Sequence, residues 1–149
     1  MSVHLQVRPR MYKLVMPPLF DDLATYIWKG RPQRIKLHLA SGGNPDLMNQ
    51  HGWTLLMVAA ASGRIPIVKA LLDAGADVNH QSPYGHTPLI AATFMGRGKV
   101  MDLLMAQGAQ WEKSSAVLQL AEWLLDGKQR HRIEELMRTA GASTARFEV

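Results

Sequence analysis

The chain has 149 residues, of which 47% are hydrophobic, and its formal net charge is +5. This length and composition predict one domain with a packed core and exclude general disorder, and the absence of cysteine excludes disulfides and thiolate metal sites. No apolar run reaches the length of a membrane-spanning helix and no secretory signal opens the chain, so we expect a cytoplasmic protein without membrane spans.

Residues 1–19 are expected to form a basic arm, which Pro17 and Pro18 separate from the first predicted helix. Residues 1–36 carry seven Lys or Arg against two Asp, so they hold the whole positive excess. Such a segment attracts anionic partners through charge alone. Binding of nucleic acid or of an acidic surface through this segment is therefore the alternative function to the one developed below.

A first helical unit is predicted over about residues 20–48. Gly30 and Gly42 lie one repeat period before two glycines of the clearer repeat that follows, and each is expected to end a helix. Asp21 or Asp22 is expected to cap the first of these helices. The two helices of this unit are predicted at residues 21–29 and 33–41. Trp28 is expected to pack between units.

The middle of the chain repeats with a period of 33, which is the separation of Gly52 from Gly85. Two stretches, residues 52–79 and 85–110, align without a gap, and they predict units at about 49–81 and 82–114. The threonines of the pattern are expected to cap first helices, and its glycines to end helices where the backbone turns left-handed. The matched pairs include Gly52 and Gly85, Thr54 and Thr87, Ala59 and Ala92, Gly63 and Gly96, and Gly75 and Gly108.

This pattern resembles the ankyrin repeat, whose opening is matched by Thr87-Pro88-Leu89 and whose close is matched by Gly75-Ala76-Asp77. The resemblance implies an all-α solenoid of helix-turn-helix units joined by hairpin loops. The sequence departs from the signature where Met57 and Ile90 replace its histidine and where Leu55 replaces its proline. These departures predict weaker turn networks than consensus repeats have.

A fourth, degenerate unit is expected over about residues 115–142, which completes an ankyrin-repeat domain over residues 20–142. Gly141 lies one repeat period after Gly108, and a stripe of apolar residues at helical spacing precedes it. A basic cluster at residues 128–132 stands just before the last predicted helix, where cations are locally unfavourable. Residues 143–149 are expected to be a frayed tail.

The resemblance implies a concave surface, lined by the hairpin loops and the first helices, that binds another protein. The spacing of 33 is expected to place Trp53 beside His86 and His51 beside Tyr84. Packing inside the protein is an equal alternative for any one of these side chains, but so many large ones favour binding. The expected partner-binding residues are Gln50, His51, Trp53, Ser62, Pro83, Tyr84, His86, Phe94 and Met95.

We therefore expect a protein-protein interaction module that is not an enzyme and needs no cofactor. Residues 96–99 lack the glycine spacing and the hydroxyl residue of a phosphate loop, and His80 and His86 lack a third metal ligand. No set of converging groups predicts catalysis. Short degenerate repeats of this kind resemble ankyrin-type immunity proteins, so a cognate bacterial toxin is one candidate partner.

Overall fold

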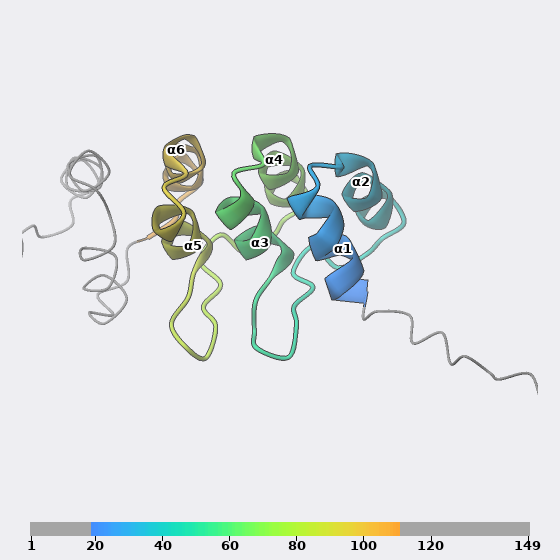
Figure 1. Ribbon diagram of the computed structural model, residues 1–149, viewed down its shortest axis with the longest axis horizontal. Coiled ribbons are helices and arrows are strands. Elements are labelled where there is room, and N and C mark those ends of the chain that lie inside the picture. The colour runs from blue at the N-terminus through green and yellow to red at the C-terminus, as the bar shows by residue number, and fades with distance from the viewer. Residues whose placement is uncertain (1–18, 111–149) are drawn as a thin grey trace, which may run out of the picture.

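The computed structural model describes residues 19–110, which form three helix-turn-helix units. The first helices of the units lie side by side in one layer and the second helices lie in another (Figure 1). Within each layer the middle helix packs against both of its neighbours. The helices are α1 (Leu19–Trp28), α2 (Pro32–Ala40), α3 (Leu55–Ser62), α4 (Ile65–Asp73), α5 (Pro88–Phe94) and α6 (Gly98–Ala106).

Residues 19–110 contain helices and loops but no strand beyond one isolated bridge, which confirms the all-α expectation. No helix within these residues is long and apolar enough to cross a membrane. The predicted arm, the predicted fourth unit and the predicted tail lie outside the described residues, except that Leu19 is already the first residue of α1.

The first helices of the second and third units begin at the predicted threonine caps. The Thr54 hydroxyl accepts a hydrogen bond from the Met57 amide at 3.3 Å, and the Thr87 hydroxyl accepts one from the Ile90 amide at 3.2 Å. Each bond satisfies one of the amides that a helix leaves without a partner at its start. Pro88 occupies the first turn of α5, where its missing N–H removes no helical bond.

The predicted cap of the first unit is wrong. Helix α1 begins at Leu19, so Asp21 and Asp22 lie inside its first turn and do not precede the helix. The extension is explained by Phe20, which is buried in the core and therefore favours a helical turn that carries it inward. Both carboxylates still lie near the positive end of the helix dipole, where negative charge is favourable.

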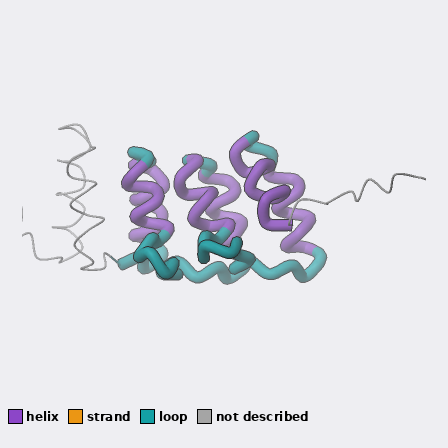
Figure 2. Tube along the Cα trace, turned by 60° about the horizontal axis from the view of Figure 1, so that its bottom comes forward, coloured by secondary structure: helices purple, strands orange, loops and turns teal. Residues whose placement is uncertain are grey.

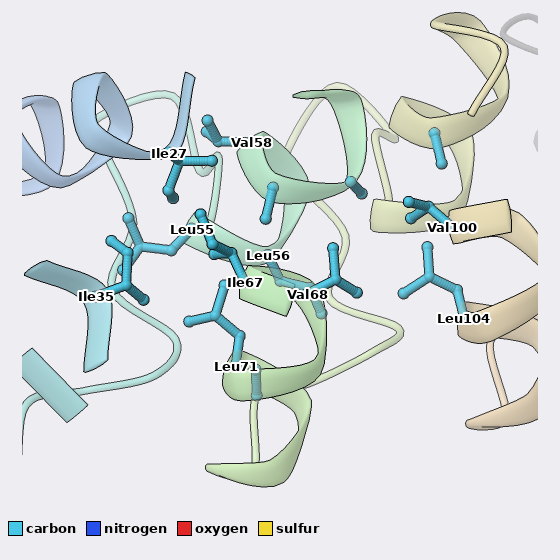
Figure 3. Packing of buried hydrophobic residues seen from close by; sticks show 14 of the residues in the cluster. Ile27, Ile35, Leu55, Leu56, Val58, Ile67, Val68, Leu71, Val100 and Leu104 are labelled. Atoms are coloured by element: carbon cyan, nitrogen blue, oxygen red, sulfur yellow. The ribbon is translucent and has the colours of Figure 1, made fainter. Parts of the chain in front are cut away.

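One continuous hydrophobic core runs between the two helical layers and through all three units (Figure 3). Every residue of α3 is buried, because α3 is flanked by α1 and α5 and is backed by α4. Small residues such as Ala59 and Ala60, both fully buried, let these neighbours approach. The thin units therefore depend on one another for burial of apolar surface.

Hydrogen bonds between units repeat with the period of the sequence. The Asp77 amide donates to the Asp46 carboxylate at 2.7 Å, and the Gln110 amide donates to the Asn79 side-chain oxygen at 2.8 Å. Both bonds join residues that lie 31 positions apart. They hold successive hairpin loops in equivalent positions along one edge of the stack.

Candidate protein-binding surface

Two hairpin loops, residues 41–54 and 74–87, lie together along one edge of the stack (Figure 2). We call this the loop edge. In the first loop the Asn49 amide donates to the Trp53 carbonyl at 3.0 Å, and in the second the Ser82 amide donates to the His86 carbonyl at 2.9 Å. Because these two bonds close the loops in the same way, corresponding residues of the two loops have equivalent backbone positions.

The Asn49 and Ser82 side chains tighten these loops further. The Asn49 side-chain oxygen accepts from the amides of His51 and Trp53, and the Ser82 hydroxyl accepts from the His86 amide. A loop whose backbone amides are satisfied internally keeps its shape without a ligand. The loop edge is therefore a preformed surface.

Three rings meet where the two loops come together. The Trp53 and His86 ring centroids lie 5.4 Å apart, and those of Tyr84 and His86 lie 6.5 Å apart. Trp53 packs against the core, His86 is half-buried, and Tyr84 is 68% exposed. The prediction that Trp53 lies beside His86 is confirmed, whereas the placement of His51 beside Tyr84 stays a prediction.

The loops also contact each other at Gly52, which meets the side chains of Pro83 and His80. A Cβ atom added to Gly52 would lie 2.7 Å from Cδ of Pro83, so the second loop packs directly over the first. A ring nitrogen of His80 lies 3.2 Å from the Gly52 carbonyl oxygen. His80 thus joins the two loops, and residues 19–110 bring no three His, Cys, Asp or Glu side chains together around a metal position.

The outer part of the loop edge is formed by side chains that solvent reaches. Gln50, His51 and Pro83 are exposed, and the Gln50 amide nitrogen lies 3.2 Å from a ring nitrogen of His51. Together with Tyr84 they give the edge a mixed aromatic and polar character. Such a composition is typical of surfaces that bind proteins.

Of the partner-binding residues predicted at the ends of the first helices, one is buried and two are exposed. Ser62 is buried, with 8% exposure, and its hydroxyl donates to the Ala59 carbonyl at 2.9 Å, so it does not belong to the surface. Phe94 and Met95 are 40% and 45% exposed. They lie at the end of α5 that is remote from the loop edge, so they form a second, separate part of the surface.

Trp28 was expected to pack between units, but it is 48% exposed at the end of α1. It occupies the position that Ala61 and Phe94 hold in the following units. The repeat alignment could have predicted the exposure of Trp28, because the same repeat position was the reason for assigning Phe94 to the surface. Trp28 therefore joins Phe94 as an exposed aromatic residue at the end of a first helix.

Some of the basic residues that support the alternative function lie within the described part of the chain, and others do not. Arg31, Arg34 and Lys36 are exposed on the first unit, and the Arg34 guanidinium carbon lies 5.2 Å from the centre of the Tyr26 ring. The remaining cations of the proposed basic arm, Arg8, Arg10 and Lys13, lie outside the described residues.

Stacked helix-turn-helix units with hairpin loops along one edge define a helical repeat protein that offers an extended surface. A family model of ankyrin repeats, in three copies, matches residues 23–115, which is more than half of the chain. The chain therefore belongs to the ankyrin-repeat family, whose repeats generally bind other proteins. No curated protein matches the chain.

Proposed function

We propose that this protein binds a partner protein through its loop edge and through the exposed end of α5, and that it performs no chemistry itself. The observation that carries the proposal is the ring cluster of Trp53, His86 and Tyr84, which has a packed base and an exposed tip. An aromatic side chain held in place this way loses little entropy on binding and supplies a large contact area. The proposed surface comprises Gln50, His51, Trp53, Pro83, Tyr84, His86, Phe94 and Met95.

The rigidity of the loops supports the same function. Asn49 and Ser82 satisfy the loop amides internally, and the contact between Gly52 and Pro83 fixes one loop on the other. A surface that is ordered before binding avoids part of the entropy loss of association. We expect such a surface to bind a partner with little rearrangement of its own backbone.

A matched pair of surface variants tests this proposal. Tyr84→Ala removes the exposed tip of the ring cluster, whereas Leu37→Ala removes a similarly exposed apolar side chain, 62% accessible, from α2 in the other helical layer. Capture of partner from the native host is expected to fall at least about tenfold for Tyr84→Ala, as for a truncated hot-spot residue. Equal capture by the two variants, with both folded by circular dichroism, would remove the loop edge from the proposal.

A cognate bacterial toxin is the narrower candidate for the partner. Its support is the resemblance of these short, degenerate repeats to ankyrin-type immunity proteins. In that role the protein would cover the active site of the toxin by surface complementarity. Co-expression with a toxin encoded beside this protein is the test: survival must depend on this protein and must be lost with Tyr84→Ala. Survival without it would contradict the narrower proposal.

The exposed cations of the first unit favour a second candidate function, which is binding to an acidic surface or to nucleic acid. Arg31, Arg34 and Lys36 face solvent, and Arg34 is held over Tyr26. Binding of this kind weakens steeply with added salt because counterions are released. Replacing all three residues by glutamine should flatten the salt dependence of partner or oligonucleotide binding. An unchanged salt dependence would exclude this surface.

A further inference from the structure

The short turns between the paired helices lie at the end of the stack opposite the hairpin loops (Figure 2). With the helix residues beside them they comprise residues 28–33, 61–66 and 94–99, which follow one another at the repeat period of 33. We call this surface the turn edge. It carries five Lys or Arg and no Asp or Glu, and its cations are Lys29, Arg31, Arg64, Arg97 and Lys99.

One arginine from each described unit forms a row along the turn edge. Arg31, Arg64 and Arg97 are 33 positions apart, and each stands directly before a second helix. The Arg64 guanidinium donates to the Trp28 carbonyl at 3.0 Å. The Arg97 guanidinium donates in the same way to the Ala61 carbonyl at 2.9 Å. These bonds hold two of the guanidinium groups against the preceding unit, and each group keeps further N–H donors for a ligand.

Apolar side chains stand among these cations. Trp28 in the first unit and Phe94 and Met95 in the third are exposed. The middle unit has small, buried residues, Ala61 and Ser62, at the equivalent positions. The turn edge therefore presents exposed apolar groups on either side of the middle unit and cations in all three units. A ligand that is complementary to this surface carries both negative charge and apolar side chains.

The carboxylates of residues 19–110 lie away from the turn edge. Five of the six lie in the first turn of α1, in the hairpin loops or at the end of α4, and they are Asp21, Asp22, Asp46, Asp73 and Asp77. The sixth, Asp102, lies in the middle of α6 at the repeat position of Lys69. With eight Lys or Arg against six Asp, these residues as a whole attract a long polyanion only weakly, whereas a short acidic segment can contact the turn edge alone.

The spacing of the units matches an extended peptide. Packed helices lie about 8–10 Å apart, so the three turns span about 20 Å from the first to the third. An extended chain rises about 3.3 Å per residue, so about six residues cover this distance. A carboxylate at every third residue of such a peptide would face successive arginines, and the side chains between them would lie near Trp28 and Phe94.

We infer that the turn edge binds an acidic, extended segment of a partner protein, with carboxylates opposite the arginine row and apolar side chains against Trp28, Phe94 and Met95. Arginine is well matched to this role, because its planar guanidinium binds a carboxylate through two parallel hydrogen bonds. The inference rests on the second candidate function for the charge of the ligand, but it extends the site from the first unit to all three and selects an acidic peptide over nucleic acid. It does not depend on the loop edge.

Fluorescence anisotropy of a labelled peptide with the full chain tests the inference. The probe is a fluorescein-labelled nonapeptide with glutamate at its second, fifth and eighth positions and leucine between them, and its glutamine counterpart should bind at least about tenfold more weakly. Lys99→Glu reverses an exposed charge of the turn edge in the third unit and should weaken binding about fivefold. Lys69→Glu makes the same change on α4, away from the turn edge, and should weaken it less than about twofold. Equal losses for the two variants, or no binding of the glutamate peptide, would overturn the inference.

Two further comparisons test the apolar contacts and the class of ligand. Trp28→Ala should weaken peptide binding about tenfold, whereas Leu37→Ala, a similarly exposed apolar residue on α2, should leave it within about twofold. A labelled oligothymidylate of the same net charge should bind more weakly than the peptide. Equal affinities for the two alanine variants, or tighter binding of the oligonucleotide, would overturn the inference. Because Tyr84→Ala tests the loop edge with the native partner, failure of the peptide would leave that proposal standing.

Discussion

The Trp53 and His86 rings lie 5.4 Å apart at an interplanar angle of 43°, and they join two hairpin loops that are 33 positions apart in the sequence. Both rings are half-buried: Trp53 packs against the core, and His86 lies between Trp53 and Tyr84. The pair therefore has two roles. Trp53 contributes to the fold through its contact with the core, and His86 supports Tyr84 in the proposed contact surface.

These two roles are separable by mutation. Trp53→Ala should lower the free energy of unfolding by about 2 kcal/mol, somewhat less than for a fully buried tryptophan, because the ring is only partly covered. Tyr84→Ala, at 68% exposure, should change it by less than about 0.5 kcal/mol. Urea unfolding followed by far-ultraviolet circular dichroism measures both. A large loss for Tyr84→Ala would mean that Tyr84 contributes mainly to the fold.

The threonine caps are expected to contribute equally to the second and third units. Thr54→Ala and Thr87→Ala each remove an acceptor for a buried amide, and each should lower the free energy of unfolding by about 1 kcal/mol. Thr54→Ser and Thr87→Ser keep the hydroxyl and serve as controls, with most of the stability retained. If serine were as harmful as alanine, the lost methyl group and not the cap would be responsible.

Features set by neighbouring residues in the sequence could be predicted. A threonine cap acts within three positions, and Gly63 and Gly75 were recognised as helix ends because glycine alone adopts a left-handed turn without strain. Both predictions are confirmed. The adjacency of Trp53 and His86 was also predicted, because a regular stack converts the sequence period into spatial contact.

Features set by packing could not be predicted in the same way. The start of α1 is decided by the burial of Phe20, and the burial of Ser62 by the helices around α3. The residues next to Asp21 and Asp22 give no sign that the helix starts before these aspartates, which are good caps. The residues next to Ser62 give no sign that it is buried, although its repeat position predicts exposure. Two hydrogen bonds between units were missed, from the Arg64 guanidinium to the Trp28 carbonyl and from the Arg97 guanidinium to the Ala61 carbonyl. Such a bond depends on how far an arginine side chain reaches towards the preceding unit. The sequence shows only that a glycine precedes the arginine in both units.

The contact between the loops predicts different outcomes at two glycines of similar φ. Gly75 has a φ of 89° with open space around its Cβ position, so Gly75→Ala should lower the free energy of unfolding by about 1 kcal/mol through backbone strain alone. Gly52, at φ 74°, also meets Pro83, so Gly52→Ala should cost about 2–3 kcal/mol. Equal losses would show that the second loop moves away freely.

Combining Gly52→Ala with Pro83→Ala identifies the source of the larger loss. Removal of the proline ring leaves the backbone strain of Gly52→Ala but relieves the clash, so the double variant should lose less than the sum of the single variants. Urea midpoints of the four proteins in this cycle provide the measurement. Additive losses would contradict a direct contact between the two loops.

The side chain of Asn79 joins the second unit to the third through two hydrogen bonds. Different substitutions can test the contributions of its oxygen and its nitrogen separately. Its oxygen accepts from the Gln110 amide at 2.8 Å, and its nitrogen donates to the Gly108 carbonyl at 3.0 Å. Asn79→Ala removes both bonds and should lower the free energy of unfolding by about 1–2 kcal/mol. Asn79→Asp keeps the acceptor but cannot donate when ionised, and it sets a carboxylate against the negative end of α6, so it should also destabilise at neutral pH. Unfolding in urea measures both variants. An aspartate variant as stable as the parent would mean that the bond to Gly108 contributes nothing and that the acceptor alone holds the third unit in register.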